Sequence, residues 1–139
     1  MKILTPTNDG AIDLVLDTLK NKKQCLVFAN TKRSAEKAAE DISKEIKSST
    51  KEQLELSNQI LHALSRPTKQ CERLSKCVKK GIAYHHAGLI GKQKELIEDA
   101  FKKGVVKIIC CTPTLAMGLQ LPAFRAIIKD LRRFGPRGL

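Results

Sequence analysis

The stretch Gln24-Cys25-Leu26-Val27-Phe28-Ala29 is a near-continuous apolar run that polar residues bracket on both sides. Such a run, without the alternation of a half-exposed strand, is typical of a strand buried on both faces of a parallel sheet. Asn30 and Thr31 form a turn after it, and apolar side chains then recur at helical spacing over residues 34–47. This succession of strand, turn and helix predicts an α/β unit.

The same alternation continues on both sides of this stretch. Asn8 or Asp9 can cap a helix whose apolar side chains extend to Leu19. Further strands are expected at 82–85, 105–111 and 126–128, and further helices at 93–103 and, as a pair broken near 65–68, within 50–80. The first helix of that pair carries Leu54, Leu56 and Ile60. The sequence therefore predicts one α/β domain over residues 1–139, with a mainly parallel sheet flanked by helices, right-handed crossovers and a helical insertion around 50–80.

Composition argues against several classes of protein. Aromatic residues make up 4% of the chain, too few for an oligosaccharide site or a platform that stacks several bases. The five cysteines are an odd number without metal-ligand spacing, so a reducing, cytoplasmic setting is expected rather than a disulfide framework. No apolar stretch approaches the roughly 18 residues of a membrane span, so no membrane partner is expected.

Charge points toward polyanions. The chain carries 26 Lys and Arg against 14 Asp and Glu, a net charge of +12. Residues 1–70 hold 12 basic and 9 acidic side chains, a difference of +3, whereas residues 71–139 hold 14 and 5, a difference of +9. Such an excess favours nucleic acid through salt-sensitive phosphate contacts, although a Lys-rich solvated surface would have the same composition.

Three loops are candidates for ligand contact, because ligands of parallel sheets meet the loops that follow the carboxyl ends of strands. They are residues 30–34, 86–91 and 112–122. The first could cradle phosphate or be a plain helix cap. The adjacent His85 and His86 should point to opposite sides of their strand, which disfavours a shared zinc ion. Gly88 allows either close approach of a ligand or a tight turn.

Three stretches resemble helicase motifs, in order and at the family's separations. Residues 25–36, which include Asn30-Thr31-Lys32-Arg33-Ser34, resemble motif IV; residues 81–89 with Gln93, which include His85-His86-Ala87-Gly88, resemble motif IVa; residues 98–104 with Thr112-Pro113-Thr114-Leu115-Ala116 and the following Gly118 to Ala123 resemble motif V. The match spans roughly residues 20–130. The chain resembles the second RecA-like domain of a superfamily 2 DExH helicase of the Ski/Brr-type branch. Within that branch it resembles the archaeal fork-unwinding DNA helicases.

The resemblance implies a division of labour among the matching positions. Thr31, Lys32, Arg33, Gly88 and Thr112 would contact the backbone of a single strand, and Gly118 and Gln120 would face ATP across a cleft between two domains. Two positions depart from the family pattern: Gln120 replaces the usual Asn or Asp, and Lys94 stands where Arg commonly follows Gln93. No residue is assigned as catalytic or as a metal ligand.

Several motifs of a complete helicase are missing from these 139 residues. There is no phosphate-loop motif, no Asp-Glu-x-His tetrad and no arginine-finger motif VI. The resemblance therefore implies a fragment that hydrolyses no ATP alone. In the parent enzyme it would work with the first RecA-like domain of the same polypeptide, ATP and Mg²⁺, on single-stranded or forked nucleic acid, with DNA favoured and DNA repair the expected process.

Three other functions stay open at this stage. The first is an RNA helicase of the same branch. The second is a stand-alone basic module that binds nucleic acid without a motor role. The third, a small α/β enzyme acting on an anionic metabolite, has no nucleophile–base pair or cofactor fingerprint to support it.

Overall fold

The computed structural model describes residues 2–4, 10–66, 68–112 and 125–128. Along the chain the elements are β1 (Lys2–Leu4), α1 (Gly10–Lys20), β2 (Cys25–Phe28), α2 (Lys32–Lys44), α3 (Lys51–Leu61), α4 (Lys69–Val78), β3 (Ile82–His85), α5 (Gly91–Lys102), β4 (Ile108–Cys111) and β5 (Arg125–Ile128). The predicted α/β class and the helical insertion around 50–80 are confirmed.

The five strands form one sheet in the order β1-β5-β2-β4-β3, and every described pair is parallel. Phe28 and His85 both pair with Cys111, so the last residues of β2, β3 and β4 are level. The loops that follow these strands therefore leave the sheet at one edge, which we call the carboxyl edge. The loops that precede the strands meet at the opposite edge, which we call the amino edge.

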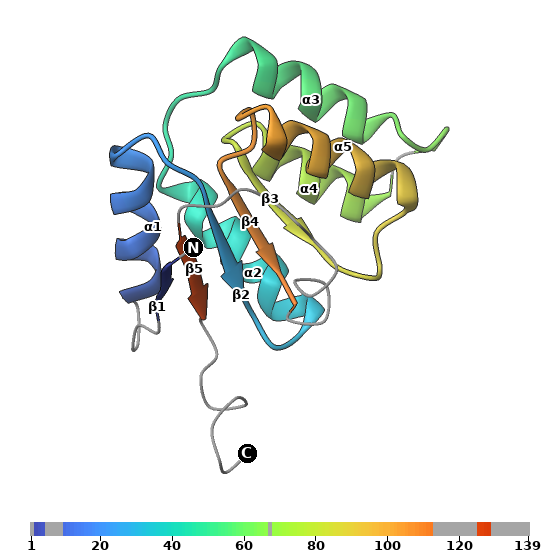
Figure 1. The fold of residues 1–139 in the computed structure, drawn as a ribbon. Coiled ribbons are helices and arrows are strands. Elements are labelled where there is room, and N and C mark those ends of the chain that lie inside the picture. Colours follow the sequence, from blue (N-terminus) through green and yellow to red (C-terminus); the bar gives the residue numbers. More distant parts are fainter. Residues whose placement is uncertain (1, 5–9, 67, 113–124, 129–139) are drawn as a thin grey trace.

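Helices cover both faces of the sheet. Figure 1 shows α2 behind the sheet and α5 in front of it, and the view from behind reverses this order. The inserted helices α3 and α4 pack against each other, and α4 also packs against β3, the strand at one edge of the sheet. A threonine caps each of α2, α3 and α4, and at α3 Thr50 and Gln53 form a reciprocal capping box.

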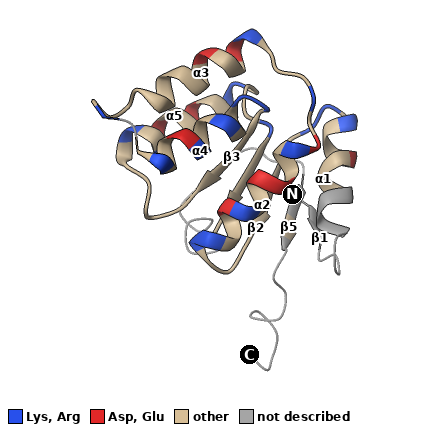
Figure 2. Ribbon diagram, turned by 180° about the vertical axis from the view of Figure 1, so that it is seen from behind, with Lys and Arg blue, Asp and Glu red and all other residues tan. Residues whose placement is uncertain are grey.

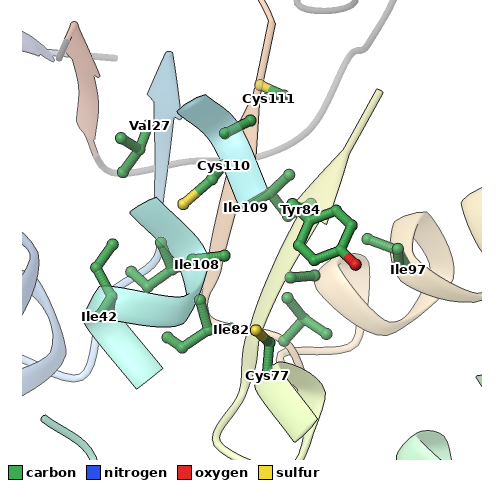
Figure 3. Packing of buried hydrophobic residues seen from close by; sticks show 14 of the residues in the cluster. Val27, Ile42, Cys77, Ile82, Tyr84, Ile97, Ile108, Ile109, Cys110 and Cys111 are labelled. Atoms are coloured by element: carbon green, nitrogen blue, oxygen red, sulfur yellow. The ribbon is translucent and has the colours of Figure 1, made fainter. Parts of the chain in front are cut away.

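The core follows the apolar runs of the sequence (Figure 3). Ile108, Ile109, Cys110 and Cys111 of β4 are all fully buried, as expected for a strand covered on both faces. The five cysteines, all among the described residues, are buried and form no disulfide. Burial raises the pKa of the Cys111 thiol to about 12, because the thiolate would lose its hydration. Cys111 therefore behaves as a small apolar side chain, whereas the Cys71 sulfur accepts hydrogen bonds from Thr68 Oγ1 and Gln93 Nε2.

Two details differ from the sequence-based expectation. The strand expected at 105–111 begins only at Ile108, because the amides of Val105 and Val106 both donate to Ala100 O and close the end of α5. Leu54, one of the apolar residues that mark α3, is 48% exposed, and Ser57 is buried. The Ser57 and Ser75 hydroxyls each donate to the other's carbonyl, at 3.0 and 3.2 Å, so α3 meets α4 through satisfied polar groups.

No helix in the described part of the chain is long and apolar enough to span a bilayer.

Candidate nucleic-acid interface

The carboxyl edge brings together the loops that carry the five predicted strand-contacting residues. Thr31 precedes α2, which Lys32 and Arg33 open, and all three are exposed. Gly88 is exposed between β3 and α5, and Thr112 is half-buried directly after β4. These segments meet because their strands are parallel and end at one level. The contact of these five residues with a strand of nucleic acid remains a prediction.

The start of α2 suits an anion. Thr31 is its N-cap, and the Thr31 hydroxyl accepts a hydrogen bond from the Ser34 amide at 3.0 Å. The same hydroxyl keeps its own proton to donate, so capping and phosphate contact are compatible. The first turn holds no acidic residue, and a helix N-terminus carries about half a positive charge. Lys32 and Arg33 add two full positive charges there.

Gly88 lies beside Lys32. A Cβ built onto Gly88 would stand 3.8 Å from Lys32 Cδ, but only 2.9 Å from His86 Cε1. Any larger residue at position 88 would therefore push against the buried His86 ring. The glycine lets the loop backbone approach its neighbours closely, and the loop and the start of α2 form adjoining surface.

His86 holds this loop in place. Its ring stacks on Tyr84, with centroids 5.6 Å apart and planes 7° apart. Nδ1 of His86 accepts the Gly88 amide hydrogen at 3.0 Å, so the ring proton sits on Nε2. Nε2 then donates to Glu36 Oε2 at 2.7 Å, which joins the loop to α2.

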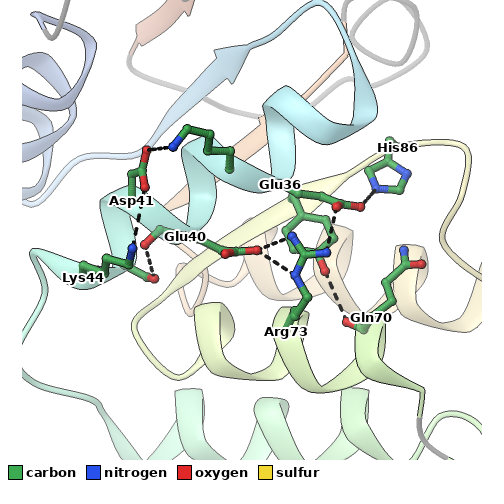
Figure 4. A network of polar contacts seen from close by, with 10 residues as sticks. Glu36, Glu40, Asp41, Lys44, Gln70, Arg73 and His86 are labelled. Atoms are coloured by element: carbon green, nitrogen blue, oxygen red, sulfur yellow. Dashed lines mark hydrogen bonds and ion pairs between the residues drawn. The ribbon is translucent and has the colours of Figure 1, made fainter.

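The hydrogen bond between His86 and Glu36 is part of a polar network that continues from Glu36 to the inserted helix α4 (Figure 4). Arg73 of α4 pairs with Glu36 Oε1 at 3.2 Å and also binds Glu40. His86, Glu36 and Arg73 thus connect the loop after β3 with α2 and α4. These residues are far apart in the sequence and form no local motif. The resemblances in residues 25–36 and 81–89 include Glu36 and His86, but not Arg73.

His85 faces the other way, as the alternation of a strand predicts. Its Nε2 lies 2.8 Å from Glu98 Oε2 of α5, while its buried Nδ1 has no hydrogen-bond partner among the described residues. The neutral ring with its proton on Nε2 satisfies this arrangement, since protonation would bury a second N–H without an acceptor. Burial lowers the pKa of His85, and the hydrogen bond to Glu98 opposes that effect. The part of the chain that the structure describes holds no group of three His, Cys, Asp or Glu side chains placed to bind a metal ion.

This depressed pKa makes stability depend on pH. As pH falls through the ordinary histidine value of about 6.5, the unfolded chain binds a proton at position 85 that the folded chain resists. The free energy of unfolding should therefore decrease from pH 7 toward pH 5. Urea unfolding at stepped pH measures this slope. His85→Gln should flatten it, and equal slopes in wild type and His85→Gln would contradict the assignment.

The two predicted nucleotide-facing residues, Gly118 and Gln120, lie outside the described residues. Of the stretch that resembles motif V after β4, only Thr112 has a described position.

Comparison with known proteins matches residues 9–132 to a family model described as the helicase conserved C-terminal domain. Similar proteins include the ATP-dependent DNA helicase Hel308 of Methanococcus vannielii, 44% identical over 136 residues, which cover 96% of this chain and 18% of the relative. Hel308 of Methanocella arvoryzae is 48% identical over 131 residues, covering 91% and 17%. Hel308 of Pyrococcus horikoshii is 41% identical over 129 residues, covering 91% and 18%. The chain thus spans less than a fifth of the length of these relatives.

Proposed function

Because this chain belongs to the helicase C-terminal domain family, we propose that it is the strand-gripping motor domain of an ATP-dependent DNA helicase. The relatives named as ATP-dependent DNA helicases support DNA as the substrate in preference to RNA. The observation that carries the proposal is the meeting of Lys32 with the Gly88 loop at the carboxyl edge, where the capped start of α2 also lies.

This edge suits contact with phosphates and is poorly equipped to read bases. Its exposed cations include Lys32 and Arg33 at the start of α2 and Lys92 at the start of α5. Its other donors are the Thr31 and Thr112 hydroxyls and backbone amides. Tyr84 is fully buried and Phe28, which ends β2 at this edge, is half-buried, so the described aromatic side chains offer little face on which a base could stack. Contacts with the phosphate backbone grip without reading sequence, and a motor that moves along a strand requires such contacts.

The ATP-dependent step would need a second domain. In our proposal, Gly118 and Gln120 face ATP and Mg²⁺ held mainly by a first RecA-like domain of the same polypeptide, next to a forked substrate. Phosphoryl transfer in this class is favoured by charges positioned around the triphosphate. The described residues contain no group of three acidic, His or Cys side chains placed to bind a metal ion, so in this proposal Mg²⁺ is held outside them. The setting would be cytoplasmic, near the nucleoid.

The proposed contact with a single strand is tested by measuring the binding of labelled single-stranded DNA across a salt series. Fluorescence anisotropy reports the binding. The chain is expected to bind with a Kd of about 10⁻⁴ to 10⁻⁶ M, independent of base sequence. Lys32→Ala and Arg33→Ala should each weaken every sequence alike, and each should reduce the log–log salt slope by about 0.7.

The matched control is Lys47→Ala, which removes one exposed lysine beyond the opposite end of α2. It should leave single-strand binding almost unchanged. Equal losses from Lys47 and Arg33 would mean that a diffuse basic surface, not the carboxyl edge, holds the strand. An RNA strand of the same sequence forms the last arm, and tighter binding to it would favour the RNA helicase alternative.

A further inference from the structure

Eleven lysines lie in the loops and helix ends around the amino edge, on the opposite side of the sheet from the proposed single-strand surface. They are Lys20, Lys22 and Lys23 before β2; Lys44, Lys47 and Lys51 between α2 and α3; Lys79 and Lys80 before β3; and Lys102, Lys103 and Lys107 before β4. All are exposed except the half-buried Lys80 and Lys107. Figure 2 shows separate blue segments on the loops between α1 and α3, which belong to the amino edge.

Few negative charges oppose these lysines. The carboxylates on the same segments are Asp17, Asp41, Glu45, Glu52 and Asp99, fewer than half as many as the lysines. Asp41 is already paired with Lys37 and Lys44. The amino edge therefore carries a concentrated positive field, which attracts polyanions.

Compensation of helix dipoles explains only part of this charge. The helices α1, α2, α4 and α5 all end at the amino edge, and each C-terminus carries about half a negative charge that a lysine in the last turn offsets. Lys20, Lys44 and Lys102 are such residues. Other lysines, including Lys47 and Lys107, lie past the helix ends, where the dipole effect has faded. A positive excess remains after the four helix ends are counted.

The backbone that carries these lysines is held firmly. Gln24 Nε2 donates to Phe101 O at 2.6 Å and to Val106 O at 2.8 Å, which ties the loop before β2 to the loop before β4. The Lys107 amide donates to Gly81 O at 2.7 Å and joins the loops before β3 and β4. A surface whose loops are already ordered loses less conformational entropy when a ligand binds.

The chemistry of the surface favours the phosphates of a duplex over a protein or a single strand. Protein interfaces are depleted in lysine and centre on aromatic anchors. The described amino edge exposes no aromatic anchor, since Phe101 and Tyr84 are fully buried. A duplex carries about one negative charge per 1.7 Å of its axis, on two rows of phosphates, and therefore meets more of a wide lysine surface than a single strand does. Lysines are point charges on flexible stems, and they suit continuous rows of phosphates without fixed bidentate geometry.

We propose that the amino edge is a second nucleic-acid surface, which binds the phosphate backbone of a duplex independently of base sequence. It is separate from the single-strand grip at the carboxyl edge, because the length of the sheet lies between them. The proposal does not rest on the helicase function, since it is built on the positions of the lysines alone.

The test compares two triple variants of the chain that lose equal charge. Lys79→Ala, Lys102→Ala and Lys103→Ala together remove three exposed lysines of the amino edge. Lys37→Ala, Arg66→Ala and Lys69→Ala together remove three exposed cations elsewhere. Anisotropy with a labelled 20-base-pair duplex and with single-stranded DNA is followed across a salt series. The amino-edge variant should bind duplex on the order of tenfold more weakly, with a salt slope reduced by about 0.9 per lysine. Its affinity for single strands should change much less.

A footprint on the wild-type protein gives a second test that does not depend on whether a variant folds. Acetylation of wild-type lysines, read by mass spectrometry, should be slowed by duplex at Lys79, Lys102 and Lys103. Equal effects of the two triple variants, or duplex protection confined to Lys32, would overturn the proposal. If Lys32→Ala loses affinity for single strands and keeps its affinity for duplex, both surfaces are supported. If Lys32→Ala leaves single-strand affinity unchanged, the result contradicts the single-strand surface at the carboxyl edge but not the duplex surface at the amino edge.

Discussion

Gly81→Ala is expected to lower the free energy of unfolding by about 2–4 kcal/mol, because it combines backbone strain with a steric clash. Gly81 has a φ of +80°, a conformation that costs a residue with a Cβ about 1–2 kcal/mol. The new Cβ would also stand 2.5 Å from Gln53 Nε2. Urea unfolding followed by circular dichroism measures the change.

Gln53 cannot move aside cheaply. It is 6% exposed, its Oε1 accepts from the Thr50 amide at 3.0 Å, and its Nε2 donates to Val105 O at 3.1 Å. Displacing it would break the capping box of α3 and leave buried polar groups unpaired. The strain of the backbone and the clash therefore add.

Two other glycines separate the contributions. Gly104 has a φ of +82°, but a Cβ there would meet only Lys107 Nζ at 3.9 Å, so Gly104→Ala should cost about 1–2 kcal/mol from strain alone. Gly91 opens α5 with nothing within 4 Å of a new Cβ, and Gly91→Ala should leave stability unchanged or raise it by up to about 1 kcal/mol. Equal losses at positions 81 and 104 would show that the contact with Gln53 contributes nothing.

The sheet was predictable where burial on both faces leaves a continuous apolar run, as in β2. The same rule extended β4 too far, because Val105 and Val106 are apolar yet close the end of α5 instead of pairing in the sheet. It also missed β1, a strand of three residues whose only described strand partner is β5, at the far end of the chain. Patterns in a short window cannot report a pairing partner so distant in sequence.

The candidate site was predictable to the extent that its residues follow strands. Topology alone brings the start of α2, the Gly88 loop and Thr112 to one edge. The bonds that fix the loop were not predictable, because Glu36, Arg73 and His86 come from separate elements. The position of the charge was not predictable. The +9 excess of residues 71–139 suggested a nucleic-acid contact near the predicted single-strand residues. The opposite edge of the sheet, however, holds five of these lysines: Lys79, Lys80, Lys102, Lys103 and Lys107. Composition gives the amount of charge, and only the fold gives its place.

His86→Ala is expected to weaken single-strand binding as strongly as Lys32→Ala, although His86 is only 2% exposed and cannot itself meet a strand. The substitution leaves the Gly88 amide without its acceptor and removes the ring that stacks on Tyr84. It should also lower the free energy of unfolding by about 2–4 kcal/mol, through a cavity and a half-buried Glu36 with one partner fewer.

Two conservative variants distinguish positioning of the loop from general stability. Asn at position 86 places an amide oxygen near the site of Nδ1, where it can accept from Gly88 but cannot reach Glu36. Gln places its amide farther out, where it can donate to Glu36 but does not hold the loop. His86→Asn should therefore recover single-strand affinity without full stability, and His86→Gln should do the reverse. Anisotropy and urea unfolding on both variants measure the two effects separately. If affinity follows stability in both variants, His86 supports the fold only, and the hydrogen bond to Gly88 has no part in holding a strand.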